Sequence, residues 1–86
     1  MGEVMIILKV FPEEPGKEDS VVEKLKQLKT GRVVEVKKEP LAFGMFVIRA
    51  GIVIPDKEDG RMQALENEVK AIPSVNQVEV EGTTLL

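Results

Sequence analysis

The chain contains no cysteine, no histidine, no tryptophan and no tyrosine, and its only aromatic residues are three phenylalanines. Without cysteine it can form no disulfide and no thiolate metal site, and without histidine it lacks the commonest general base and zinc ligand. Lys9 interrupts the first apolar run, no other run approaches membrane-spanning length, and the start lacks the basic residues of a signal peptide. We therefore expect a cytoplasmic protein.

The charge of the chain is nearly balanced, with 12 Lys and Arg against 15 Asp and Glu and a net charge of -3. A surface that binds a phosphate backbone needs excess positive charge, so nucleic acid is disfavoured as a direct ligand. Of the 86 residues, 43% are hydrophobic and 31% charged, which is typical of one small globular domain. We expect this single domain to cover residues 1–86.

Hydrophobic periodicity predicts four strands and two helices. Alternating apolar residues indicate strands over 3–11, 32–39, 45–54 and 74–81, with the second and fourth the more charged. Apolar residues at helical spacing indicate one helix through Val21, Val22, Leu25 and Leu28, and another through Met62, Leu65, Val69 and Ile72.

Local signals indicate where these helices begin and end. Ser20 and Glu23 have the spacing of a capping box, although 17–19 could form an earlier turn, and Gly31 is a candidate left-handed stop. Asp59 is the predicted N-cap of the second helix, which is predicted to end at Pro73.

The order strand-helix-strand-strand-helix-strand contains two crossover connections, and right-handed crossovers place both helices on one face of one sheet. This arrangement is the ferredoxin-like α+β sandwich, a two-layer fold with a four-stranded antiparallel sheet. Its first and third strands lie in the middle, which agrees with their high hydrophobicity here. The charged strands then form the edges.

The sheet face away from the helices is expected to be partly apolar. Its apolar side chains are predicted to be Met5, Ile7, Phe11, Met45, Val47 and Val53, and its charged ones Lys9, Lys37, Arg49 and Glu79. Such a face is either a contact surface for another protein or an ordinary protein exterior. It is not an RNA-stacking platform, because Ile7, Val47 and Arg49 stand where aromatic rings would be needed.

Carboxylates are grouped at three places: Glu13 with Glu14, Asp56 with Glu58 and Asp59, and Glu79 with Glu81. The first two groups lie in polar turns and the third on an edge strand, and no histidine or glycine-rich ion loop completes a site. We therefore expect no enzyme active site, no metal and no cofactor.

The segment Glu-Pro-Leu-Ala-Phe-Gly at 39–44 places a large aromatic ring in a loop before the most hydrophobic strand. Pro40 stiffens the approach to Phe43, and Gly44 frees the backbone after it. The ring either folds back onto its own core or projects outward as a plug for another protein.

Three segments carry a resemblance to a known family. They are Leu-Lys-Val-Phe-Pro at 8–12, the loop at 39–44, and the closing valine-rich strand with its short apolar tail, and the loop is the most specific of them. Over its whole length the chain resembles the archaeal elongation factor 1-beta family and is similar to the C-terminal exchange domain of the eukaryotic factor. The resemblance implies a ferredoxin-like domain that releases guanine nucleotide from elongation factor 1-alpha, the GTPase that delivers aminoacyl-tRNA to the ribosome.

The resemblance also implies an outward-projecting Phe43 that enters a pocket on the GTPase. The loop neighbours Leu41, Ala42 and Gly44 are expected to contribute to the same contact. In this reading Phe43→Ala lowers exchange and leaves the fold intact.

The second device implied by the family is a C-terminal tail, here with Leu85 and Leu86, that disturbs the magnesium and phosphate region of the GTPase. The eukaryotic domain has a penultimate lysine there, whereas the last basic residue of this chain is Lys70. The tail therefore either acts through its bulk and terminal carboxylate or leaves exchange to Phe43 and its surroundings.

A regulatory or dimerisation module of the same fold that binds a small ligand is the alternative. The exposed-looking loop around Phe43 favours the exchange factor. We expect a monomer that binds elongation factor 1-alpha, with weak self-association as the lesser alternative, and no direct contact with nucleic acid or membrane.

Overall fold

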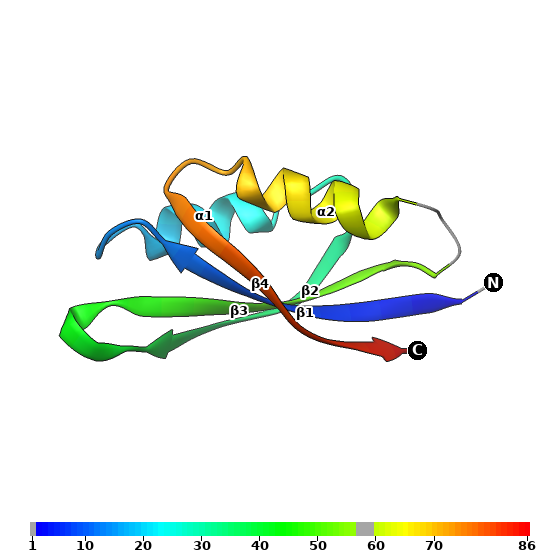
Figure 1. The fold of residues 1–86 in the computed structure, drawn as a ribbon, viewed down its shortest axis with the longest axis horizontal. Helices are drawn as coiled ribbons and strands as arrows, with labels where there is room; N and C mark the ends of the chain where they lie inside the picture. The colour runs from blue at the N-terminus through cyan, green and yellow to red at the C-terminus, as the bar shows by residue number, and fades with distance from the viewer. Residues whose placement is uncertain (1, 57–59) are drawn as a thin grey trace.

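Four strands and two helices follow one another in the predicted order in the computed structural model, which describes residues 2–56 and 60–86. The elements are β1 (Glu3–Pro12), α1 (Glu18–Leu25), β2 (Arg32–Pro40), the short 3-10 helix η1 (Ala42–Gly44), β3 (Phe46–Pro55), α2 (Arg61–Lys70) and β4 (Val75–Leu85). The strands form one antiparallel sheet in the order β2-β3-β1-β4, and both helices lie on the same face of it (Figure 1). The predicted ferredoxin-like sandwich is confirmed, with β1 and β3 in the middle.

The core lies between the sheet and the helices because alternate residues of a strand point to the same side. Its fully buried members are Ile6, Leu8, Val10, Ile48, Ala50 and Ile52 from the strands and Val21, Leu25, Leu65 and Val69 from the helices. Burying each of the larger side chains stabilises the fold by about 1.5–3 kcal/mol. This packing holds α1, whose 8 residues are too few for an independent helix. No helix in the described ranges is long and apolar enough to cross a membrane.

The first helix includes the earlier turn that the prediction left open at 17–19, and it stops short of the predicted Leu28. It begins at Glu18 rather than after a capping box at Ser20, because the Glu18 carboxylate accepts a 3.0 Å hydrogen bond from the Gly16 N–H and secures the preceding turn. It ends at Leu25, after which the hydrogen bonds span three residues instead of four. The Gln27 N–H donates to the Lys24 carbonyl at 3.0 Å and the Leu28 N–H to the Leu25 carbonyl at 3.3 Å. Leu28 still packs against the core from this turn.

Gly31 is not a left-handed helix stop, so that prediction is wrong. The glycines with positive φ among the described residues are Gly16, Gly44 and Gly60. Gly31 lies instead against β3, where an added Cβ would come within 2.6 Å of Cγ2 of Ile52 and 2.8 Å of Cγ2 of Ile54. Glycine is needed here for a close approach of the loop to the sheet.

The second helix carries its predicted stripe, with Leu65 and Val69 fully buried. Its first helical residue is Arg61 and its N-cap is Gly60 with φ of 78°, so the predicted N-cap at Asp59, a residue outside the described part, is wrong. The helix ends at Lys70, before the predicted end at Pro73.

Candidate functional site

The β2–β3 hairpin extends past the end of its other neighbour in the sheet. Pairing between β1 and β3 stops at Val10 opposite Ile48, whereas pairing between β2 and β3 continues to Pro40 opposite Phe46. The hairpin therefore projects at one end of the molecule (Figure 1). A loop at such a tip has room to contact another protein.

The tip itself is a tight turn. Ala42–Gly44 form η1, the Leu41 N–H donates a 2.7 Å hydrogen bond to the Met45 carbonyl, and the Met45 N–H donates a 3.3 Å bond back to the Ala42 carbonyl. Gly44 leaves the turn with φ of 73°, a backbone conformation that costs other residues about 1 kcal/mol or more. The backbone after Phe43 therefore adopts a conformation that depends on glycine at position 44, as predicted.

The backbone of Phe43 lies at the centre of this turn. The prediction that its ring projects outward concerns a side chain outside the described part of the structure. Its neighbours are exposed: Leu41 is 47% exposed, and Ala42 and Gly44 are exposed too.

The C-terminal tail is part of the sheet, which corrects the prediction of a strand that ends at Glu81. β4 continues to Leu85, which pairs with Val4, and the Leu86 N–H donates a 2.9 Å hydrogen bond to the Glu3 carbonyl. Leu85 and Leu86 are nonetheless 72% and 64% exposed. Backbone pairing with β1 therefore presents two apolar side chains on a fixed strand end.

The hairpin tip and the tail lie at opposite ends of the molecule. Leu85 is level with Val4 and, across β1, with Ile54 near the end of β3, while the hairpin tip precedes Phe46 at its beginning. At about 3.4 Å per residue, the 10 residues of β3 separate the two ends by about 30 Å, and Figure 1 shows the tip and the C-terminus at opposite ends of the long axis. The predicted contact residues thus form two patches rather than one.

A charged cluster lies between the two patches on the open face of the sheet. Arg49 of β3 donates to Glu39 of β2 at 3.2 Å and also to Glu81 of β4, and Lys9 of β1 pairs with Glu81 at 3.5 Å. The two hydrogen bonds and the neighbouring carboxylates raise the pKa of Arg49. Desolvation raises the pKa of Glu81, but the Arg49 hydrogen bond and the charges of Arg49 and Lys9 outweigh it, so this pKa is lowered. The cluster links all four strands.

The irregularity that places Glu81 in this cluster was not visible in the sequence. Pairing between β1 and β4 shifts register between Ile7, opposite Gly82, and Leu8, opposite Val80, so Glu81 is the extra residue of a bulge. A bulge re-aims a side chain without leaving a periodic signal.

The predicted apolar side chains of the open face are mostly covered rather than exposed. Val47 and Val53 are buried, and Met5, Ile7, Phe11 and Met45 are half-buried. Gly51 explains part of this, since Met5 Sδ and Ile7 Cδ1 lie 3.5 and 3.6 Å from the position its missing Cβ would take. The larger exposed apolar side chains in the described ranges lie elsewhere, at Val34, Leu41, Val80, Leu85 and Leu86.

Acidic groups do not assemble into a cation site in the part of the chain that the structure describes, where no cluster of three or more potential ligands is present. Glu13 and Glu14 are exposed in the turn after β1, and Glu81 is engaged by Arg49 and Lys9. Of the second predicted group, Glu58 and Asp59 lie outside the described residues.

Residues 5–86 match the family described as the EF-1 guanine nucleotide exchange domain. Proteins named elongation factor 1-beta are similar over nearly the whole chain: one from Methanospirillum hungatei is 36% identical with complete coverage of both chains. Another, from Staphylothermus marinus, is 38% identical over 95% of this chain and 94% of its own.

The fold is also seen in a solved structure, the ACT domain from GTP pyrophosphokinase of Chlorobium tepidum. It has a TM-score of 0.63 and 14% identity, and the match covers 93% of this chain and 99% of that one. At this identity the likeness concerns the fold alone. By the family match and by its full-length relatives, the chain belongs to the EF-1 guanine nucleotide exchange domain family.

Proposed function

We propose that this protein promotes the exchange of GDP for GTP on elongation factor 1-alpha during translation elongation, and that the tip of the β2–β3 hairpin is its principal contact. Guanine nucleotide exchange is the function of the family to which the chain belongs. The observation that supports the choice of contact is the η1 turn, which holds Phe43 at the end of a hairpin that outreaches β1.

Exchange requires a difference in affinity rather than bond chemistry. A factor that binds the nucleotide-free GTPase more tightly than the GDP-bound form must, by thermodynamic reciprocity, weaken GDP binding by the same factor. The protein therefore needs a surface that fits a distorted GTPase, and it needs no catalytic side chain. We propose that the chain is not an enzyme in its own right.

The hairpin contact is formed by Phe43 together with Leu41, Ala42 and Gly44. A phenylalanine ring transferred into a dry pocket is a strong candidate for a binding hot spot, worth about 2 kcal/mol or more. The turn hydrogen bonds between Leu41 and Met45 hold the backbone in one conformation, which lowers the entropy lost on binding.

The second contact is formed by Leu85 and Leu86, about 30 Å away along β3. Two exposed leucines on a strand end that is hydrogen-bonded to β1 form a small rigid apolar patch. The last basic residue in the sequence is Lys70, so this patch acts through its bulk and not by delivering a cation. Contacts at both ends would let one rigid domain bridge two parts of the GTPase.

We further propose that residues 1–86 act as one domain, as a monomer in the cytoplasm, with no direct contact with nucleic acid or membrane. The basis is the net charge of -3 and the shared core between the sheet and both helices.

The test is the release of fluorescent GDP from elongation factor 1-alpha, measured with and without the protein in excess unlabelled nucleotide. We expect the rate of GDP release to rise with the concentration of the protein and to reach a plateau. Release that does not depend on the protein would contradict it. The double variant Leu85→Ser with Leu86→Ser then measures how much of the acceleration the tail provides.

A further inference from the structure

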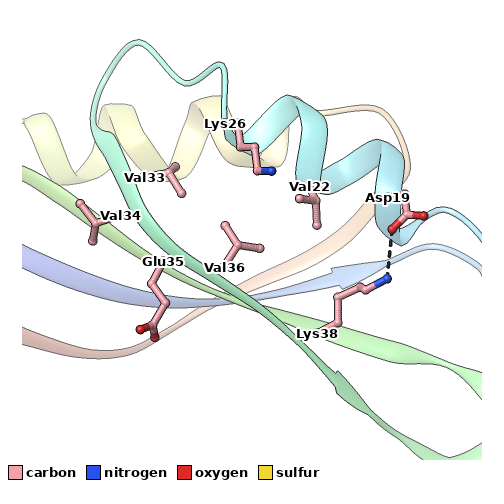
Figure 2. Close-up of a pocket in the computed structure, with 8 residues that line it drawn as sticks. All are labelled: Asp19, Val22, Lys26, Val33, Val34, Glu35, Val36 and Lys38. Atoms are coloured by element: carbon pink, nitrogen blue, oxygen red, sulfur yellow. Dashed lines mark hydrogen bonds and ion pairs between the residues drawn. The ribbon is translucent and has the colours of Figure 1, made fainter.

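A groove lies between α1 and the edge strand β2, away from both patches assigned to the GTPase. Its volume is about 450 Å3, and its lining residues are Asp19, Val22, Lys26, Val33, Val34, Glu35, Val36 and Lys38. This volume falls within the range of sites that hold small molecules or a few peptide side chains. Figure 2 shows the groove with its wall residues.

The floor of the groove is apolar. Val22 of α1 and Val33 and Val36 of β2 are half-buried and pack against the core. In Figure 2, Val22 and Val36 face each other across the groove, whereas Glu35 points away from it. A ligand must therefore offer apolar groups to this floor.

The two ends of the groove differ in charge. At one end Lys38 Nζ lies 3.0 Å from Oδ1 of Asp19, which neutralises both groups and bridges β2 to α1. On the rim, directly after the end of α1, lies Lys26, which makes no ion pair with any residue that the structure describes. Lys26 also belongs to the segment 24–32, which has four basic residues and no acidic one in a chain whose net charge is -3. The open rim is thus positive and suits a carboxylate.

On the side of β2 that faces away from β3, no strand lies beside it among the residues that the structure describes. An edge strand presents unpaired backbone N–H and C=O groups that can pair with an added strand. The register of β2 against β3 is irregular between Val33 and Glu35, so Val34 is an extra residue, 50% exposed. From Glu35 onward the pairing is regular, and this stretch borders the groove.

From these features we infer that the groove binds an extended acidic peptide of a partner protein. The peptide pairs with the edge of β2 from Glu35 onward, its apolar side chains rest on the valine floor, and a carboxylate lies beside Lys26. A second copy of this chain fits less well, because an antiparallel two-fold pairing from Glu35 onward would bring the paired Asp19–Lys38 ends together and would offer no acidic partner to Lys26. RNA fits less well because the floor offers valines and no aromatic ring, and because Asp19 lines one end. The inference is independent of the exchange activity.

The experiment is an NMR titration of the 15N-labelled protein with the eight-residue peptide Glu-Ser-Val-Ser-Val-Ser-Glu-Ser, in which the valines and glutamates lie on the same face of an extended chain. We expect saturable shifts at the amides of residues 19–26 and 33–38. Lys26→Glu, an exposed substitution at the residue after α1, should weaken binding about fivefold to tenfold, since it replaces an attraction by a repulsion. Lys70→Glu, the same charge change on α2, is the matched control and should leave the affinity unchanged.

Peptide composition provides the second comparison. Replacing the valines by serine should abolish the shifts, as should replacing the glutamates by lysine. Shifts that map elsewhere, equal affinities of the wild type and Lys26→Glu, or shifts that appear with an octauridine RNA but not with the peptide would each overturn the inference. Exchange on the GTPase should be unchanged by Lys26→Glu, which shows that the variant is folded.

Discussion

The Thr30 hydroxyl donates a 2.6 Å hydrogen bond to Oε1 of Glu68, and so joins the loop after α1 to the second helix. The backbone N–H groups of Lys29 and Thr30 donate to the same carboxylate at 3.0 Å. Arg61, two turns earlier on α2, donates at 3.1 Å to the Thr30 carbonyl. One helix therefore satisfies the polar groups of a loop that has no regular structure of its own.

Glu68→Ala should destabilise the domain by about 1–3 kcal/mol, because it leaves the N–H groups of Lys29 and Thr30 without their acceptor. The free energy of unfolding from chemical denaturation measures this. Glu66→Ala, on the same helix, is the matched control and should cost little. Equal losses in the two variants would mean that the Glu68 hydrogen bonds contribute nothing specific.

The same carboxylate should make stability depend on pH. Partial burial raises the pKa of Glu68, but the hydrogen bonds from Thr30 and Lys29 outweigh it, and the pKa in the folded protein is lowered. Its contribution is therefore complete above the unfolded pKa, about 4.3, and is lost as the pH falls through the lower folded value. Denaturation between pH 5 and 2 should show a shallower decline for Glu68→Gln than for the wild type. Identical slopes would count against the assignment.

Gly31→Ala should destabilise the fold by about 1–3 kcal/mol, since its Cβ would lie 2.6 Å from Cγ2 of Ile52. Thermal unfolding is a sufficient measurement. Gly82→Ala serves as the comparison, because within residues 2–56 and 60–86 no atom beyond its two chain neighbours lies within 4 Å of the position of its Cβ. A Gly31→Ala variant as stable as the wild type would show that the side chains of Ile52 and Ile54 can move aside at no cost in stability, and would contradict the prediction.

Gly44→Ala should lower exchange. An alanine is strained at φ of 73°, and the turn that holds Phe43 would change its conformation to relieve this strain. We expect a loss of stability of about 1 kcal/mol and a clear reduction in the rate of GDP release. Gly16→Ala carries the same kind of strain, with φ of 92°, in the turn before α1. It should lose similar stability and keep full exchange. Equal exchange rates in the two variants would show that the geometry of the turn at Gly44 does not affect GDP release.

The topology was predictable because the central strands alternate regularly, as in Ile6, Leu8 and Val10, and each of these residues is fully buried as expected. Features that depend on contacts distant in the sequence were not predictable. Gly31 is a glycine because of Ile52 and Ile54, and no local rule distinguishes this from a helix stop.

The candidate site was predictable only in part. The loop at Phe43 could be identified by its composition and by its family resemblance, but its distance from Leu85 depends on strand register. The closing segment also carries a weak strand signal, since Gly82, Thr83 and Thr84 have little hydrophobicity. Backbone pairing with β1 makes it a strand nevertheless.

The groove between α1 and β2 could not be found in the sequence. Its floor residues Val22, Val33 and Val36 read as ordinary core positions. These side chains are partly exposed because the short helix α1 does not fully cover the sheet edge at β2, and this depends on the packing of the two elements rather than on the local sequence.

The role of Phe43 as the principal contact is tested most directly by the rate at which the Phe43→Ala variant releases GDP from elongation factor 1-alpha. A lost hot spot of about 2 kcal/mol corresponds to a decrease of roughly 30-fold in the second-order rate constant, with circular dichroism and the unfolding midpoint unchanged. Val80→Ala, which shortens an exposed apolar side chain away from both patches, should exchange at the wild-type rate. A folded Phe43→Ala variant that releases GDP as fast as the wild type would contradict the account.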